Sequence, residues 1–275
     1  MIRTRHLGSV LSILLLVLAL AGCASSKKST EPRGALSRIV QNGVIRVGMT
    51  GEQPPLTMMS RDGEFLGLDV ALMRVLAQNM GVEARFVKLP FNRLLDALDT
   101  GDVDVVMSGM TITPARVERV AFVGPYFTSG KTLLTRTAEL AAVEIAEDLN
   151  RPELRFAALA GSTSEDFARA MLPNSKILTP DRLDEALGMV LSGKVDALIA
   201  DRETCSFAVL RHPGEGLIAS SATFTLEPMG IAVPLDQPHL ASLIQSYLTA
   251  LSEKGAIEKA RAFWFEDPTW VENLR

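Results

Sequence analysis

The residues best suited to hold a small molecule lie between positions 108 and 116, where the chain reads Ser-Gly-Met-Thr-Ile-Thr-Pro-Ala-Arg. The preceding run Val103–Met107 is short, apolar and rich in β-branched residues, which predicts a buried strand. Thr113–Pro114 has the residue types of a helix N-cap and first helical position. The hydroxyl groups and the glycine between these two signals are therefore expected in a loop at the carboxyl end of a strand, where α/β folds place ligands.

Arg116 supplies the chemistry of this loop. It falls in the first turn of the predicted helix, where a cation opposes the helix dipole, so a negative group nearby would relieve the conflict. A ligand carboxylate held by two guanidinium nitrogens meets that need. A surface arginine paired with a neighbouring acid is the alternative, and Glu118 is the nearest candidate in sequence.

A second strand end carries the opposite charge. The segment 98–104 (Leu-Asp-Thr-Gly-Asp-Val-Asp) is similar to 190–196 (Val-Leu-Ser-Gly-Lys-Val-Asp), and each predicts a helix end, a glycine and an apolar strand. The first strand leads to the hydroxyl loop, which can donate hydrogen bonds to an anion. The second leads to Asp201, which either offers a carboxylate to a cation or caps the helix after it. Together the two ends would suit a zwitterion, because burying either charge alone is costly.

Composition narrows the class of protein. The chain has 275 residues, 47% of them hydrophobic, which indicates one or two domains with substantial cores. The formal net charge is −4 and no basic run is present, so a nucleic-acid partner is not expected. The histidines, His6, His212 and His239, lack the spacing of metal ligands, so neither a metal nor another cofactor is predicted.

The N-terminus has the layout of a secretory signal. Arg3 and Arg5 precede the apolar run 7–22, which is short for a membrane-spanning helix of roughly 20 residues. The exit, Leu-Ala-Gly-Cys, resembles a bacterial lipobox, which implies a signal peptide over 1–22 and lipid, palmitate included, on Cys23. An ordinary signal peptide with a chance cysteine is the alternative. Residues 23–34 are mostly small and polar and predict a flexible tether that anchors the protein to a membrane.

Strand-like runs alternate with helical patterns over the remaining chain, which predicts an α/β fold with mostly parallel sheets. Helices are expected over 69–80, 91–100 and 181–191, the first capped by Asp69. The pattern restarts near Leu154, so we expect two such units.

A series of short motifs, in this order, points to a family. They are Gly43–Gly48, Gln53–Pro55, Asp62–Gly63 with Leu66–Asp69, Gly101–Asp104, Thr111–Arg116, Phe122 with Gly124–Tyr126, Gly161–Thr163 and Val195–Asp201. From about residue 42 to 265 the chain resembles the bacterial extracellular solute-binding proteins of family 3, the polar amino-acid receptors of ABC importers.

The resemblance implies a two-lobe clamshell, the type II fold of periplasmic binding proteins, in which each lobe is a mostly parallel sheet flanked by helices. Lobe 1 would comprise 35–134 plus 229–275 and lobe 2 135–228, with hinges near 134–138 and 227–230. Ligand would bind between the lobes and close them. The implied protein is an extracytoplasmic, lipid-anchored monomer, in the periplasm or at the cell surface, that hands an amino acid or similar zwitterion to an ABC permease.

The resemblance also implies roles for single residues. Arg116 would hold the ligand's α-carboxylate and Asp201 its α-ammonium group. Phe91 would form a wall of the side-chain pocket, whereas Gln53 stands where the family often has an aromatic residue. The groups expected beside the carboxylate are those of Ser108, Gly109, Thr111 and Thr163.

Two other functions stay open. Cyclohexadienyl dehydratases resemble these receptors but eliminate water and carboxylate from a ring acid, which requires a general acid in the cleft. Glu52 and Glu203 are the candidates for that role. A ligand sensor for a separate partner is the second alternative. We predict binding without catalysis, because an intact pair of Arg116 and Asp201 suits an amino acid better.

Overall fold

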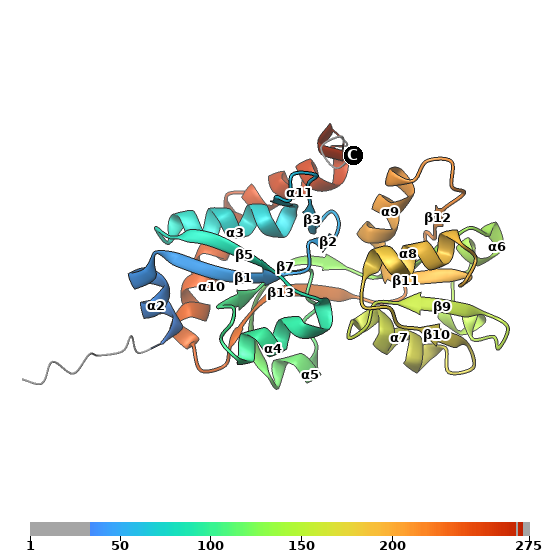
Figure 1. Ribbon diagram of the computed structural model, residues 1–275, viewed down its shortest axis with the longest axis horizontal. Coiled ribbons are helices and arrows are strands. Elements are labelled where there is room, and N and C mark those ends of the chain that lie inside the picture. Colours follow the sequence, from blue (N-terminus) through green and yellow to red (C-terminus); the bar gives the residue numbers. More distant parts are fainter. Residues whose placement is uncertain (1–33, 268, 272–275) are drawn as a thin grey trace, which may run out of the picture. The chain divides into compact units, whose positions relative to one another are not determined.

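The computed structural model describes residues 34–267 and 269–271. In this part the chain forms two five-stranded sheets, each flanked by helices, and a small three-stranded sheet (Figure 1). The predicted signal peptide, Cys23 and nearly all of the predicted tether lie outside the described residues. No helix in the described ranges has the length and apolar character needed to cross a membrane.

The first sheet has the strand order β5-β1-β6-β13-β7 and forms lobe 1. Its middle strand β6 pairs parallel with β1 and antiparallel with β13, so the sheet is mixed. The strands are β1 (Val44–Met49), β5 (Glu83–Lys88), β6 (Val105–Val106), β7 (Val120–Ser129) and β13 (Glu227–Pro234). The helices around it are α2 (Ala35–Asn42), α3 (Leu68–Asn79), the 3-10 turn η1 (Phe91–Arg93) with α4 (Leu94–Asp99), α5 (Pro114–Val117), α10 (Pro238–Glu253) and α11 (Ala256–Glu266).

The second sheet has the order β10-β9-β11-β8-β12 and forms lobe 2. Here β9 pairs parallel with β10 and β11, and β8 is antiparallel to β11. The strands are β8 (Lys131–Thr135), β9 (Arg155–Ala158), β10 (Lys176–Leu178), β11 (Ala197–Asp201) and β12 (Ile218–Ala219). The helices are α6 (Ala138–Ala141), the 3-10 turn η2 (Ala146–Leu149), α7 (Thr163–Met171), α8 (Leu183–Leu191) and α9 (Arg202–Arg211).

The chain changes sheets earlier than the predicted lobe boundary at 134/135. All of β8 pairs with β11 of the second sheet, so the first crossing lies at Gly130. A side chain there would clash, because a Cβ atom would lie 2.1 Å from Thr223 Cγ2 and 2.3 Å from the Thr225 carbonyl oxygen. The return crossing runs beside it, since Glu227 at the start of β13 pairs with Ser129 at the end of β7. The two crossings therefore form one closely packed pair of segments.

The similar segments at 98–104 and 190–196 end in the same interaction. Asp104 Oδ2 accepts from the backbone N–H of Arg46 at 2.8 Å, and its carboxylate also pairs with that arginine's guanidinium. Asp196 binds the backbone and guanidinium of Arg155 in the same way, again with an N–O distance of 2.8 Å for the backbone bond. Each aspartate thereby fixes the start of a central strand to its neighbour.

Apolar side chains form separate cores under the two main sheets. The small antiparallel sheet of β2 (Glu52–Gln53), β3 (Thr57–Met59) and β4 (Phe65–Leu66) adds a cluster with the C-terminal residues. In it Trp270 stacks on Phe207 of α9, with centroids 5.4 Å apart and planes 8° apart, and meets Trp264 edge-on. The C-terminal segment thus contacts lobe 2 after α11 has packed on lobe 1.

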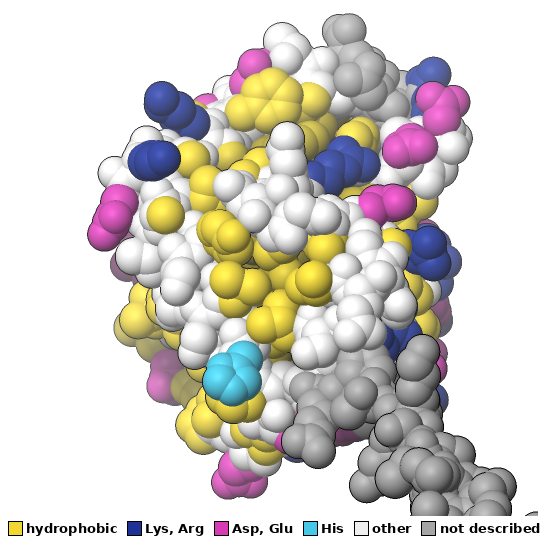
Figure 2. Space-filling model, turned by 90° about the vertical axis from the view of Figure 1, so that its left-hand side faces the viewer, with side chains coloured by type: hydrophobic (Ala, Val, Ile, Leu, Met, Phe, Trp, Pro, Cys, Tyr) yellow, Lys and Arg dark blue, Asp and Glu magenta, His cyan; other side chains and the backbone are white. Residues whose placement is uncertain are grey.

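The α2 end of lobe 1 exposes apolar surface. Figure 2 looks at this end and shows apolar side chains gathered near the centre of the face. Val40 of α2 and Leu235 after β13 are among the large apolar residues that are more than half exposed.

Candidate functional site

Six of the eight predicted ligand residues line one pocket where the two lobes meet. Its volume is about 20 Å³, which is space for about one water molecule. The lobes therefore lie against each other here, and a bound amino acid would need them to separate or its neighbours to shift. The pocket is lined by Gln53, Phe91, Gly109, Thr111, Thr163 and Asp201 together with Lys131, Leu159, Ser162, Ser164, Leu183, Ile199, Ala200 and Thr204.

Arg116 lies at the edge of this pocket, in α5. The predicted cap is confirmed, because Thr113 Oγ1 accepts from the Arg116 backbone N–H at 3.3 Å. The guanidinium donates to the Thr111 carbonyl at 2.9 Å and, across the cleft, to the Gly161 carbonyl at 3.2 Å. It also lies 5.4 Å from the centre of the Phe91 ring, a cation–π distance.

The Arg116 guanidinium lacks a carboxylate within salt-bridge distance among residues 34–267 and 269–271. Burial lowers its pKa, while the charges of Asp166, Glu227 and Asp201 act in the opposite direction from a greater distance. Glu118, the alternative surface partner, does not pair with it in this part of the chain. Arg116 is therefore a partly buried cation whose donors meet backbone carbonyls, and a carboxylate would bind it more strongly than they do.

The loop after β6 is held by buried polar groups of lobe 1. The Ser108 hydroxyl donates to Gln53 Oε1 at 2.9 Å and accepts from the Thr50 N–H at 3.1 Å. The Gly109 N–H, from a residue that we expected beside the ligand, donates to Asp69 Oδ2 at 2.8 Å. The loop is therefore positioned by its own lobe before any ligand arrives.

Asp69 does not cap its helix, so that prediction is wrong. The N-cap of α3 is Gly67, whose φ is 123°, and a Cβ atom there would lie 2.2 Å from the Leu56 carbonyl oxygen, so no side chain fits. Asp69, the second residue of α3, is fully buried, and burial raises its pKa to about 7 although the Gly109 N–H and the Tyr126 hydroxyl lower it. Its role is to hold the binding loop.

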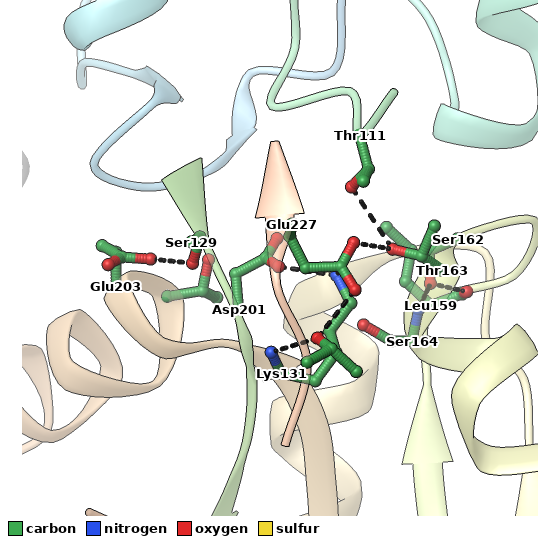
Figure 3. Close-up of polar contacts among 12 residues, drawn as sticks. Thr111, Ser129, Lys131, Leu159, Ser162, Thr163, Ser164, Asp201, Glu203 and Glu227 are labelled. Carbon is green, nitrogen blue, oxygen red and sulfur yellow. Dashed lines mark hydrogen bonds and ion pairs between the residues drawn. The ribbon is translucent and has the colours of Figure 1, made fainter. Parts of the chain in front are cut away.

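Thr163 joins the two lobes at the base of the pocket. It is the first residue of α7, behind the N-cap Ser162, whose hydroxyl accepts from the Ser164 and Glu165 N–H groups. Its hydroxyl lies 3.4 Å from the Thr111 hydroxyl and donates to Glu227 Oε2 at 3.0 Å (Figure 3). The two hydroxyls that we expected beside the ligand's carboxylate therefore lie together, and Thr163 also binds a glutamate that the sequence did not indicate.

Lys131 and Glu227 are the site residues that sequence reasoning missed. Lys131 is 2% exposed, and its Nζ lies 2.6 Å from Asp201 Oδ1 and 3.7 Å from Glu227 Oε2 (Figure 3). Burial raises the pKa of Glu227, but the Lys131 charge and the surrounding threonine hydroxyls more than offset that and hold it below its usual value. The signal available was a lysine at the head of an apolar strand, but its partners are 70 and 96 positions away.

The two candidates for a general acid are engaged outside this pocket. The Glu203 carboxylate accepts a hydrogen bond from Ser129 and pairs with Arg202 at 3.1 Å. Glu52 pairs with Lys88 at 3.0 Å and with Arg182 of lobe 2 at 3.3 Å. In the described ranges no group of three or more His, Cys, Asp or Glu could hold a metal ion.

Solved structures define the class of protein. The fold matches an ancestral amino-acid-binding protein described as a precursor of cyclohexadienyl dehydratase, with 33% identity and a TM-score of 0.78 over 84% of this chain and 99% of that one. It also matches an ancestral arginine-binding protein bound to arginine, with 31% identity and a TM-score of 0.77 over 81% and 98% of the two chains. The predicted type II periplasmic-binding-protein fold is thereby confirmed.

The sequence then gives the family. The model of the bacterial extracellular solute-binding proteins, family 3, matches residues 45–267, and this chain belongs to that family. It is 27% identical to the cyclohexadienyl dehydratase of Pseudomonas aeruginosa over 95% of both chains. It is 25% identical to the L-cystine-binding protein TcyJ of Escherichia coli over 94% of this chain and 96% of that one. The predicted family is confirmed, and its members are extracytoplasmic.

Proposed function

We propose that this protein captures a small amino acid, or a close relative that keeps the carboxylate, between its lobes and delivers it to the permease of an ABC importer. The observation that carries the proposal is Arg116, a partly buried guanidinium at the lobe boundary whose hydrogen-bond acceptors in the described part of the chain are backbone carbonyls. The relatives whose names give a ligand bind cystine, histidine, arginine or glutamine, which supports an amino-acid-like ligand here.

The surrounding groups fit a carboxylate at this position. The Thr111 and Thr163 hydroxyls lie together beside the guanidinium, and Thr163 begins helix α7, whose N-terminus favours negative charge. The Phe91 ring covers the guanidinium and the Gln53 amide lines the pocket, so these two would meet the ligand's side chain. Asp201 keeps one carboxylate oxygen that no described residue binds, and we assign that oxygen to the ligand's polar group at the α-carbon.

Anchoring and partner remain parts of the same proposal. Lipid on Cys23 would hold a monomeric body at the outer face of the membrane that contains the permease.

A thermal-shift screen of the free amino acids tests the binding function. A ligand present at 100 times its dissociation constant should add about 2.7 kcal/mol to the free energy of unfolding. Calorimetry on the ligands found would then give affinity and stoichiometry, with one site per chain expected. If every amino acid and every related carboxylate left the melting temperature unchanged, the proposal would be refuted.

Dehydration of a ring acid is the second candidate function, and the extent of the similarity to the P. aeruginosa dehydratase favours testing it. The geometry supports binding better, because Glu203 faces Ser129 and the pocket lining at the start of α9 is Thr204. Incubation with prephenate and with arogenate, followed by detection of phenylpyruvate or phenylalanine, decides between the two. Turnover that disappears in Glu203→Gln would establish the enzyme, and its absence with both acids leaves the binding protein.

A further inference from the structure

Two oppositely charged groups at the cleft are in different states before a ligand arrives. Asp201 already has a cation, because Lys131 Nζ lies 2.6 Å from its Oδ1. Arg116 has none of the carboxylates in the described ranges as a partner, and its two closest acceptors are carbonyl oxygens. In the described part of the cleft, therefore, Asp201 has a cationic partner and Arg116 has no anionic one.

This difference decides which ligands are penalised. In a site where an aspartate waits for the ligand's ammonium group, a ligand without that group leaves a desolvated carboxylate unpaired. Such a loss costs roughly 30-fold or more in affinity. Here Lys131 remains beside Asp201 whether or not the ligand carries an ammonium group, so the carboxylate keeps a cation and the cost of losing the ammonium group is smaller.

Lys131 also has a donor to spare. An ammonium group carries three N–H bonds. One is directed at Asp201, and Glu227 Oε2, at 3.7 Å, is its other acidic neighbour. Because Lys131 lines the pocket, its remaining N–H can donate to an oxygen on the ligand's α-carbon. An ammonium group at the same position has no lone pair and could not accept that hydrogen bond. Two acidic side chains face Lys131, Asp201 from β11 and Glu227 from β13. The positive charges of Lys131 and Arg116 balance the negative charges of these two acids.

We propose that this cleft binds small 2-oxo or 2-hydroxy carboxylic acids about as well as the matching amino acids, with Lys131 in place of the ligand's ammonium group. The inference rests on the proposed function, because it uses the same cleft and the same carboxylate at Arg116. In it the carboxylate meets Arg116, the Thr111 and Thr163 hydroxyls lie alongside, and the oxygen on the α-carbon accepts from Lys131 Nζ. Lys131 is then a specificity residue. It determines which group the ligand can carry on its α-carbon, and it does not select the ligand's side chain.

The test uses matched pairs that differ only at the α-carbon. Calorimetry on the wild-type protein would compare L-phenylalanine with phenylpyruvate, L-glutamate with 2-oxoglutarate, and L-alanine with pyruvate and L-lactate. The inference expects the better-bound pair to show dissociation constants within tenfold of each other. A preference for the amino acid above tenfold overturns it and leaves the binding function intact, whereas failure of the full thermal-shift screen of amino acids and related carboxylates overturns both.

Variants at Lys131 assign the effect. In Lys131→Met the oxygen on the α-carbon loses its donor and Asp201 loses its cation, so the ratio of the two dissociation constants should shift at least tenfold toward the amino acid. Lys131→Arg keeps a cation and should restore the wild-type ratio. An unchanged ratio in Lys131→Met overturns the role of Lys131. If Lys131→Met does not fold, the ratios of dissociation constants for the matched ligands still test the inference on the wild-type protein and on Lys131→Arg.

Discussion

Strands β6 and β11 occupy similar places in the two lobes. They resemble each other where they begin and differ where they end. At the starts of β6 and β11, Asp104 and Asp196 bind the backbone and guanidinium of Arg46 and Arg155 with nearly the same distances. At the other ends the chemistry diverges. The loop after β6 leads to Arg116, a cation without a carboxylate in the described part of the chain, whereas β11 ends at Asp201, a carboxylate already paired with Lys131.

The difference separates positions that hold the fold from positions that choose the ligand. An aspartate that accepts from a backbone N–H at a strand start serves any ligand, so both lobes can keep it unchanged. A charge at the carboxyl end of a strand faces the cleft, where each lobe must present a different group to one small molecule. Four predictions sharpen this division, from the largest expected effect to the smallest.

Replacing Arg116 by alanine should weaken ligand binding more than any other single change considered below. Truncating one partner of a buried charge pair costs ~2–5 kcal/mol, which is roughly 30-fold to several-thousand-fold in affinity. Calorimetry with a ligand found in the screen measures it. Arg119→Ala is the matched control, since Arg119 is about half exposed and pairs only with Asp96 and Asp99 among described residues. Near-native affinity in Arg116→Ala would remove the ligand role from this strand end.

Replacing Asp69 by asparagine should flatten the pH dependence of stability. The pKa of Asp69 is raised to about 7, so between about pH 4 and pH 7 the folded state binds a proton that the unfolded state has lost. Stability from this group is therefore fully present at pH 4 and is lost as the pH rises through 7, by ~2–4 kcal/mol at ~1.4 kcal/mol per pKa unit. Urea unfolding of wild type and Asp69→Asn at pH 4.5 and 8 gives the difference. Parallel pH profiles would exclude a raised pKa at this site.

Replacing Asp104 by asparagine should destabilise the protein without altering ligand preference. Asp104 is 2% exposed and binds both Arg46 and Arg38, and these interactions outweigh its burial and hold its pKa below the usual value. Loss of the charge should cost about 2–3 kcal/mol, less than a fully buried pair because both arginines can regain water. Urea unfolding at pH 7 measures the cost. A change in ligand preference would contradict a purely structural role.

Replacing Asp196 by asparagine should have a smaller effect of the same kind. Its side chain is 28% exposed and its partner Arg155 is 42% exposed, so solvent screens the pair. The same unfolding experiment should show a midpoint between those of wild type and Asp104→Asn. If the two variants lost the same free energy of unfolding, burial would not explain a difference between the Asp104 and Asp196 ion pairs.

Much of the fold was predictable because its signals are local. Thr113 and Pro114 specify the start of α5 by residue type, and the glycines after α4 and α8 mark helix ends in the two similar segments. The error at Asp69 has a physical reason. Aspartate at the start of a helical pattern suits a cap, but its actual partner, the Gly109 N–H, lies 40 positions away in the sequence.

The pocket was predictable in part for the same reason. Arg116, Thr111 and Thr163 sit at strand-to-helix junctions, which sequence patterns locate. Lys131 and Glu227 lie within strands at the two crossings, where an isolated charge in an apolar run gives no hint of its partner. Lys131 meets Asp201 because β8 pairs with β11 and the two residues are partners in that pairing, and it meets Glu227 because the two crossings pack side by side.

The aromatic cluster at the C-terminus gives the molecule a built-in optical probe. Both tryptophans of the sequence, Trp264 and Trp270, lie in one cluster that follows α11 of lobe 1 and stacks on Phe207 of lobe 2. Separation of the lobes would move Phe207 away and expose indole surface to water. Intrinsic emission, without any label, would therefore follow domain motion on addition of a ligand, and Phe207→Leu would serve as the blank.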